Sequence, residues 1–300
     1  MKMEERAGYR SGFVGIVGRP NGGKSTILNY YLGEKVAIVT PHPQTTRHRI
    51  LGVLTREDAQ VMFLDTPGFQ QPQHVLGRFM REVAKAVMDE ADVLVAVIDG
   101  RRGVMEDDER VFARLRQARR PCVLAINKID LMKKPLLLPL LDTCAKTRLF
   151  SDCIPVSART GEQMDLLLAQ VVAHLPEGPR WYEPQDHTDQ TTSQLIGEFI
   201  REQILLATRQ ELPHAVGVLV EQIEERQEVT AIHATILVER PGQKAIVIGR
   251  GGSMLKRIGQ EARRQLERLL GRKVYLELWV KVAEGWRSDE RVLRQLGYAA

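Results

Sequence analysis

The stretch GRPNGGKST, residues 18–26, decides the fold of the first half of the chain. It matches G-x-x-x-x-G-K-[ST] and follows an apolar run, residues 13–17, that is typical of a buried strand. Glycines let backbone N–H groups approach phosphate oxygens, and the helix that follows adds the partial positive charge of its N-terminus. We therefore predict a phosphate-binding loop in which Lys24 reaches the β- and γ-phosphates and Ser25 offers a hydroxyl to Mg²⁺. The loop residues expected to contact the nucleotide are Gly18, Arg19, Pro20, Asn21, Gly22, Gly23, Lys24, Ser25 and Thr26.

Short apolar runs alternate with helix-like segments as far as about residue 175. Strands are predicted at residues 13–17, 61–64, 93–98 and 122–126, and helices at residues 25–32, 76–88, 107–118 and 164–174. This alternation predicts an α/β domain with a doubly wound, mostly parallel sheet and helices on both faces.

Two segments between these elements complete a magnesium site. Asp65 ends a predicted strand, where its carboxylate can hold Mg²⁺, and it opens the run Asp65, Thr66, Pro67, Gly68 and Phe69. The Gly68 N–H can approach the γ-phosphate. In the polar segment PHPQTTRHRI, Thr46 is the expected further metal ligand, with Thr45 as the alternative. The predicted metal ligands are thus Ser25, Thr46 and Asp65.

The run NKID, residues 127–130, identifies the base as guanine. Guanine presents two adjacent donors on one edge, and the Asp130 carboxylate can accept both, whereas adenine would leave that charge unpaired. Asn127 can bond the base and tie neighbouring loops together, the Lys128 stem can lie along the ring, and Ile129 lies between Lys128 and Asp130. Ser157 and Ala158 follow another apolar run, and the Ala158 N–H can meet the guanine O6. The predicted cofactors are GTP or GDP with Mg²⁺.

The last part of the chain is basic and has a different pattern of elements. From residue 241 to the end there are 13 Lys and Arg against 6 Asp and Glu, a net charge of +7 in a chain of net +5. Such asymmetry favours a polyanionic partner. Predicted elements are a helix at 193–208, strands at 215–223 and 230–238, a helix at 254–270 and a strand at 273–282, with a G-x-x-G sequence before the second helix. That loop and its flanks give the RNA-contact candidates Ile248, Gly249, Arg250, Gly251, Gly252, Lys256 and Arg257.

The quoted motifs together resemble the Era family, bacterial GTPases with an RNA-binding tail. The resemblance covers nearly the whole chain. It implies a GTP-binding domain over residues 10–177, a linker over 178–191 and a type II KH domain over 192–300, with a short helix at 245–248 although the Val-rich composition there favours a strand. The chain departs from the family at Gly22, where a small apolar residue is usual, and in the linker sequence WYEPQD. Adjacent glycines at 22 and 23 predict a looser loop.

The resemblance also implies activity and partners. Phe69 stands where many small GTPases have a Gln that orients water, so slow intrinsic hydrolysis is expected, and Asn21 matches a position that helps to hold K⁺ in related GTPases. The expected catalytic set is Lys24, Asn21, Thr46 and Gly68. The implied role is assembly of the small ribosomal subunit through single-stranded ribosomal RNA near its 3′ end.

Composition limits the remaining possibilities. No apolar run approaches the ~20 residues of a membrane span. The first residues lack the apolar core of a signal peptide, and three cysteines without metal-like spacing favour a reducing cytoplasm. We expect a cytoplasmic monomer, with weak peripheral attachment to the inner face of the membrane left open. The alternatives are a membrane-surface GTPase regulator that uses the basic domain as a general polyanion-binding face, and a protein that holds GTP without cleaving it.

Overall fold

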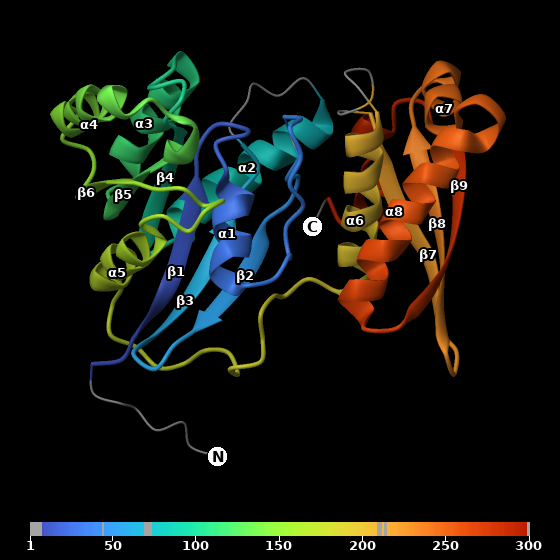
Figure 1. The fold of residues 1–300 in the computed structure, drawn as a ribbon, viewed down its shortest axis with the longest axis horizontal. Coiled ribbons are helices and arrows are strands. Elements are labelled where there is room, and N and C mark those ends of the chain that lie inside the picture. The colour runs from blue at the N-terminus through green and yellow to red at the C-terminus, as the bar shows by residue number, and fades with distance from the viewer. Residues whose placement is uncertain (1–7, 44, 69–73, 209–211, 213–214, 299–300) are drawn as a thin grey trace. The chain divides into compact units, whose positions relative to one another are not determined.

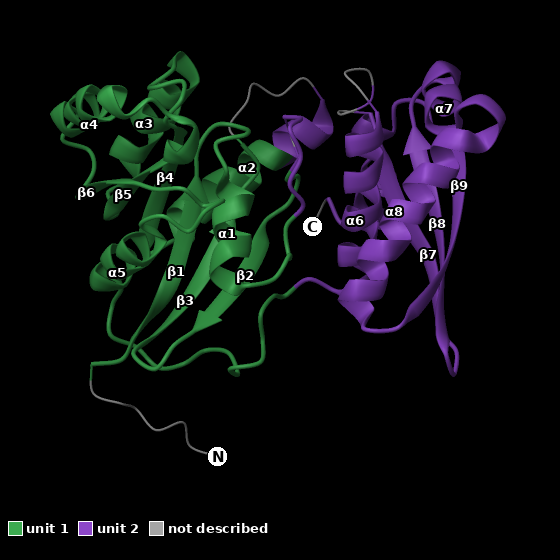
Figure 2. Ribbon diagram, viewed as in Figure 1, with its two compact units in different colours: residues 1–37, 46–71, 80–189 green, residues 38–45, 72–79, 190–300 purple. Residues whose placement is uncertain are grey.

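The computed structural model describes residues 8–43, 45–68, 74–208, 212 and 215–298. It divides into two compact units (Figure 2). The first comprises residues 1–37, 46–71 and 80–189, and the second comprises residues 38–45, 72–79 and 190–300. The second unit thus includes two segments that lie inside the predicted GTP-binding domain, and the domain boundaries stay a prediction.

Among the described residues of the first unit, six strands form one sheet in the order β2-β3-β1-β4-β5-β6 (Figure 1). They are β1 (Arg10–Val17), β2 (Ile50–Thr55), β3 (Ala59–Asp65), β4 (Val93–Asp99), β5 (Cys122–Asn127) and β6 (Asp152–Pro155). Only β2 runs antiparallel to its neighbour in this described sheet, so the prediction of a mostly parallel sheet is confirmed. β3 and β4 are buried along their whole length, as expected for strands covered on both faces.

The helices of this unit cover both faces of the sheet. They are α1 (Lys24–Leu32), α2 (Val75–Glu90) from residue 80 onward, α3 (Glu106–Ala118), α4 (Leu137–Lys146) and α5 (Met164–His174). Ile27 of α1 and Leu168 of α5 pack in one cluster with Val14 of β1, whereas residues of α3 and α4 pack with Leu94 of β4 in another. Because β1, β3, β4, β5 and β6 run parallel, the loops that follow them lie at one edge of the sheet, where α/β proteins bind ligands.

The second unit has a three-stranded sheet in its described residues, in the order β7-β8-β9. Its elements are α6 (Thr192–Ala207), β7 (Gly217–Glu225), β8 (Val229–Val238), α7 (Pro241–Ile248), α8 (Ser253–Leu270), β9 (Lys273–Val282) and α9 (Glu290–Gln295). β7 pairs antiparallel with β8, and β8 pairs parallel with β9. The order helix, strand, strand, helix, helix, strand is that expected for a type II KH domain.

Helices α6 and α8 pack on one face of this sheet. Phe199 of α6 and Leu266 of α8 lie in one buried cluster with Ile232 and Ile236 of β8. Burial of each such side chain contributes about 1.5–3 kcal/mol. Residues 245–248 form the end of α7, in agreement with the resemblance rather than with Val-rich propensity, because Pro241 suits the first turn of a helix and Gly249 ends it.

Candidate nucleotide and RNA sites

The predicted phosphate loop connects the end of β1 to the start of α1. Lys24 is buried, and its Nζ donates to the carbonyl oxygens of Gly18 at 3.2 Å and Arg19 at 3.1 Å. Burial lowers the pKa of Lys24 to about 8. A phosphate bound next to this ammonium group would favour its charged form. Lys24 is therefore placed inside the loop, where a phosphate is expected to bind.

A side chain at position 23 would not fit this loop. Gly23 has φ +105°, and a Cβ there would lie 2.1 Å from Nδ2 of Asn127. Gly22 has no such backbone requirement, and a Cβ there would lie 3.2 Å from the Val97 carbonyl oxygen. The two adjacent glycines therefore differ. Gly23 is needed because Asn127 approaches its backbone closely, whereas a side chain at Gly22 would be crowded but its backbone conformation would not be strained.

The three predicted metal ligands lie together. The Ser25 hydroxyl donates to Oδ2 of Asp65 at 2.6 Å, the Thr46 hydroxyl donates to the same oxygen at 3.2 Å, and the two hydroxyl oxygens are 3.0 Å apart. The other oxygen of Asp65, Oδ1, is buried and lacks a hydrogen-bond partner among the described residues. Burial raises the pKa of Asp65. A buried carboxylate oxygen beside two hydroxyls suits a hydrated Mg²⁺, which takes oxygen ligands.

The neighbouring threonine is directed elsewhere. The Thr45 hydroxyl lies 2.8 Å from the Thr40 hydroxyl and donates to the His42 carbonyl at 2.8 Å. The geometry thus favours Thr46 over the alternative, Thr45.

Residues 66–68 are held against the phosphate loop. The Thr66 hydroxyl donates to the Ile16 carbonyl at 2.8 Å, Pro67 is buried, and a Cβ on Gly68 would lie 2.6 Å from the Pro20 nitrogen. Phe69 lies outside the described residues.

The predicted base-binding motif is built around Asn127. Its Nδ2 donates to the Gly22 carbonyl at 3.0 Å, and its Oδ1 accepts from the N–H groups of Lys128 at 2.8 Å and Ala158 at 3.1 Å. Asn127 therefore ties the loops after β5 and β6 to the phosphate loop. The Ser157 hydroxyl donates to Oδ1 of Asp130 at 2.7 Å, which orients a carboxylate that is otherwise exposed. Ile129 lies in the short 3₁₀ turn beside Asp130.

The Lys128 side chain has partners that its motif did not predict. Its Nζ donates to the Asn21 carbonyl at 2.5 Å and pairs with Oδ2 of Asp99 at 2.9 Å. Burial acts to raise the pKa of Asp99, but hydrogen bonds from Arg101 and Lys128 outweigh it and lower the pKa. The Lys128 ammonium group is consequently held between the phosphate loop and the end of β4.

The G-x-x-G loop lies between α7 and α8. Gly249, Gly251 and Gly252 all have positive φ values, of 73°, 57° and 80°, a region of backbone conformation that favours glycine. Arg250 is exposed, Lys256 is exposed at the start of α8, and the Arg257 guanidinium donates to the Ala207 carbonyl at 2.9 Å. The three predicted cationic residues do not play one role, because Arg257 is engaged with α6 while Arg250 and Lys256 face solvent.

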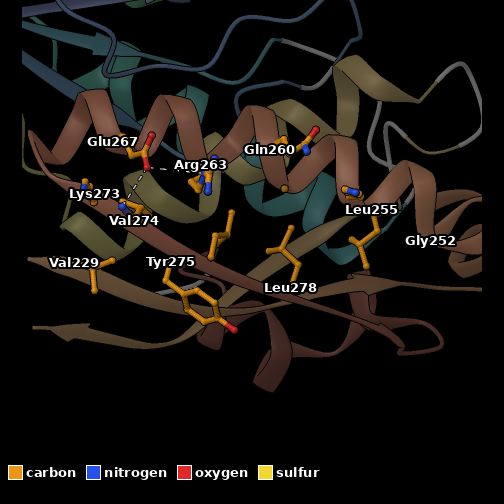
Figure 3. Close-up of a pocket in the computed structure, with 13 residues that line it drawn as sticks. Val229, Gly252, Leu255, Gln260, Arg263, Glu267, Lys273, Val274, Tyr275 and Leu278 are labelled. Carbon is orange, nitrogen blue, oxygen red and sulfur yellow. Dashed lines mark hydrogen bonds and ion pairs between the residues drawn. The ribbon is translucent and has the colours of Figure 1, made fainter.

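A groove runs from this loop along α8 and β9 (Figure 3). Its cavity has a volume of about 760 Å³. Gly252, Lys256 and Arg263 lie on one side and Leu278 and Tyr275 on the other. Ile248 does not line this cavity and is half-buried at the end of α7.

Comparisons with known proteins find matches to both parts of the chain. Residues 13–128 match a family model described as 50S ribosome-binding GTPase, and residues 211–287 match the KH domain. Era from Aquifex aeolicus, solved as a variant bound to GDP and aluminium fluoride, is 40% identical with a TM-score of 0.94, and the match covers 97% of this chain and 100% of that one. A second Era structure has the same identity, coverage and TM-score and is a complex with MgGDPNP and nucleotides 1506–1542 of 16S ribosomal RNA.

This chain belongs to the Era family. Its GTPase activity, its α/β GTPase fold and its KH domain are family properties. No helix among the described residues is long and apolar enough to cross a membrane.

One feature of this Era-family chain was missed from the sequence. Arg19, at the second position of the phosphate loop, forms an ion pair with Asp108 near the start of α3, with Nε and Oδ2 3.2 Å apart. Both side chains are buried, and the Asp108 carboxylate also accepts from the Met105 N–H at 3.0 Å. The sequence indicates this pair only through Arg19 itself, because an arginine in a buried loop requires a counter-charge and the sequence does not say which acidic residue supplies it.

Proposed function

We propose that this chain is a GTP-dependent switch that binds single-stranded ribosomal RNA near the 3′ end of the small-subunit RNA and assists small-subunit assembly. The observation that supports the proposal is that the predicted nucleotide residues Ser25, Asp65, Asn127 and Ala158 are linked by hydrogen bonds in a chain that also has a groove ending at a G-x-x-G loop. The Era structure bound to nucleotides 1506–1542 of 16S ribosomal RNA supports this choice of partner. We propose residues 10–177 and 192–300 as the two domains, joined by residues 178–191.

In this proposal the phosphates, the guanine base and Mg²⁺ are each bound by different residues. Lys24 and the N–H groups of the loop bind the phosphates, and Asp130 accepts from the guanine edge. Ser25, Thr46 and Asp65 would hold Mg²⁺, which would neutralise charge on the phosphates. The backbone of Gly68 is placed beside Pro20, where its N–H can approach a terminal phosphate.

Hydrolysis by this chain is proposed to be slow and to depend on potassium. Asn21, with φ +61°, is exposed at the tip of the phosphate loop, and its carbonyl is held by Lys128. A monovalent cation near the phosphates would supply the positive charge that an arginine finger gives to other GTPases. The test compares phosphate release in KCl and NaCl at equal ionic strength, with Asn21→Ala as the variant that should lose the difference. Equal rates in the two salts would contradict the potassium proposal.

Nucleotide state is proposed to reach the RNA-binding unit through the segment before Thr46. The chain leaves the second unit at Thr45 and enters the first at Thr46. Within the second unit, the Arg201 guanidinium donates to the Thr45 carbonyl, and the Val39 N–H donates to the Glu202 carboxylate at 2.9 Å. Thr46 is joined by one peptide bond to Thr45, whose carbonyl accepts from Arg201 of α6. A shift of Thr46 would therefore move a residue that is bound to α6.

The test of the function is an RNA titration at fixed salt. An RNA from the 3′ end of small-subunit RNA and a scrambled RNA are titrated with the protein bound to a GTP analogue and to GDP. The proposal expects preference for the 3′ sequence and a different affinity in the two nucleotide states. Equal, weak binding of both RNAs in both states would contradict it. We further propose that the protein acts as a cytoplasmic monomer, and vesicle co-sedimentation tests the weak membrane attachment that the sequence leaves open.

A further inference from the structure

Asp99, the last residue of β4, is a charged residue in the interior of the first unit. It is buried, and in the sheet it lies opposite Asn127, the first residue of the base-binding motif. A buried charge requires partners. Those of Asp99 come from two directions, because Arg101 follows it in its own loop and Lys128 belongs to the base-binding motif on the neighbouring strand.

Four hydrogen bonds hold the Asp99 carboxylate in one orientation. Its Oδ1 accepts from the backbone N–H of Arg101 at 3.1 Å and from Nε of the same residue at 3.0 Å. Its Oδ2 accepts from Nη2 of Arg101 at 2.6 Å and from Nζ of Lys128 at 2.9 Å. The lowered pKa of Asp99 means that the group is ionised at neutral pH. Arg101 therefore fixes a carboxylate that presents one of its oxygens to Lys128.

The Lys128 side chain lies along the phosphate loop. Its backbone has φ +68°, a left-handed conformation that is uncommon for residues other than glycine. The stem passes Gly23, since Cε lies 3.9 Å from the position that a Cβ on Gly23 would take. The ammonium group then bonds both the Asn21 carbonyl and Asp99. A lysine stem loses rotamer freedom when it is fixed, and these two bonds offset that cost before a nucleotide binds.

We propose that Asp99 is a positioning residue for the guanine base and that it acts through Lys128. The proposal rests on the nucleotide site proposed above and adds a residue to it. Held at its ammonium group, the Lys128 stem is an apolar strip along which the face of the base lies, while Asp130 accepts from the edge of the base. In this arrangement Asp99 contacts neither base nor phosphate. It therefore sets the affinity for the nucleotide and leaves the choice of base to Asp130.

The alternative role of Asp99 is to shape the turn after β4. Its carbonyl accepts from the Arg102 N–H at 3.0 Å and its Oδ1 from the Arg101 N–H, as in many turns that begin with an aspartate. That role needs one side-chain oxygen and no charge. It does not account for Lys128, whose ammonium group pairs with the other oxygen although 24% of the lysine side chain is exposed to solvent.

The experiment measures the affinity of the full chain for GDP and for inosine diphosphate, which lacks the 2-amino group of guanine. Asp99→Asn keeps an oxygen for the Arg101 N–H, so the turn is retained, but it places an amide donor opposite the Lys128 ammonium group. We expect it to bind GDP at least about fivefold more weakly, because a hydrogen bond to a charged group is lost. Inosine diphosphate should lose affinity by the same factor, since the edge of the base is still read by Asp130. Asp130→Asn, in contrast, should weaken GDP more than inosine diphosphate.

Three further variants test the route through Lys128. Lys128→Met removes the ammonium group and keeps an apolar stem, and it should weaken GDP binding. Added to Lys128→Met, Asp99→Asn should cost less than about a further twofold, because the interaction has already been lost. Arg101→Gln frees the carboxylate to rotate and should weaken GDP binding by less than Asp99→Asn does. Arg102→Gln alters the exposed neighbour in the same loop and is the matched control, which should leave the affinity unchanged.

Unfolding of the nucleotide-free chain separates affinity from stability. If Asp99→Asn lowers the stability but the folded variant binds GDP normally, Asp99 only shapes the turn and the proposal is overturned. Losses that multiply in the double variant, or a Lys128→Met variant that binds GDP normally, would also overturn it, while Asp130→Asn still reports on the base-binding site. If the unaltered chain binds no GDP, the proposed function fails as well.

Discussion

The ion pair between Arg19 and Asp108 is predicted to stabilise the phosphate loop. The relative exposures of the two side chains are 9% and 0%, and Nε and Oδ2 are 3.2 Å apart. At an effective dielectric constant of 20 the attraction at this distance is about 5 kcal/mol, and desolvation of both groups offsets much of it. Removal of one partner leaves the other charge buried and alone, which costs about 3–5 kcal/mol.

Two single variants and their combination measure this interaction. Asp108→Asn keeps an oxygen for the Met105 N–H, so the start of α3 is preserved and only the charge is lost. Arg19→Met keeps the aliphatic stem. Each single change should lower the free energy of unfolding by about 3–5 kcal/mol, and the double variant should lose much less than the sum because no lone charge remains.

The assay is unfolding of the nucleotide-free chain. The transition of the first unit is the one that GDP shifts upward, since a ligand that binds the folded state stabilises it. A loss of 3–5 kcal/mol lowers the midpoint of a unit of this size by about 6–20 °C. Arg110 and Glu106 form an exposed pair on the same helix, with nitrogen and oxygen 2.6 Å apart, so Glu106→Gln is the matched control and should leave the transition where it is. Strictly additive losses, or single losses below about 1 kcal/mol, would refute the reasoning.

Four further results are expected. Asp130→Asn should lower the affinity for GDP by about tenfold or more. It should favour xanthosine diphosphate, because the C2 oxygen of xanthine replaces the amino donor of guanine. Competition binding with the two nucleotides checks this. Because burial lowers the pKa of Lys24 to about 8, the affinity for nucleotide should fall as pH rises above that value. Calorimetry in two buffers should detect proton uptake on binding. An affinity that stays constant from pH 8 to pH 10 contradicts this. The unfolded lysine holds its proton up to higher pH, so the nucleotide-free fold should gain stability over the same range. Gly23→Ala should abolish nucleotide binding, because its Cβ would collide with Asn127. Gly22→Ala should change the affinity for nucleotide by less than tenfold. Equal effects of the two variants would show that the loop relaxes freely.

Sequence alone predicts those parts of the site that depend on local order. The phosphate loop, the strand that ends at Asp65 and the strand that ends at Asn127 each join a motif to the apolar run before it, and the sheet then brings their ends together. What it misses are partners set by the tertiary fold. Asp108 looks like one of several acidic residues at the start of a helix until packing places it beside Arg19.

The choice between Thr45 and Thr46 shows the same limit. Both are polar residues in one segment, and no periodicity separates them. Packing does, because Thr46 is buried next to Ser25 and Asp65, while the Thr45 hydroxyl is used within its own turn. The sequence likewise does not define the bounds of antiparallel β2, because its run ILGVLT is interrupted by a glycine.

The register of strand β9 decides which of its side chains face the helices. It pairs with β8 over its full length, from Lys273 to Val282, in one unbroken parallel register. A shift by one residue would bury Trp279 and expose Leu278, so the register that completes the hydrophobic core also directs the rings outward. Burial of Leu276 and Leu278 therefore fixes the direction in which Tyr275 and Trp279 point. For this reason substitutions of the exposed rings Tyr275 and Trp279 should cost less stability than substitutions of Leu276 and Leu278 on the buried face.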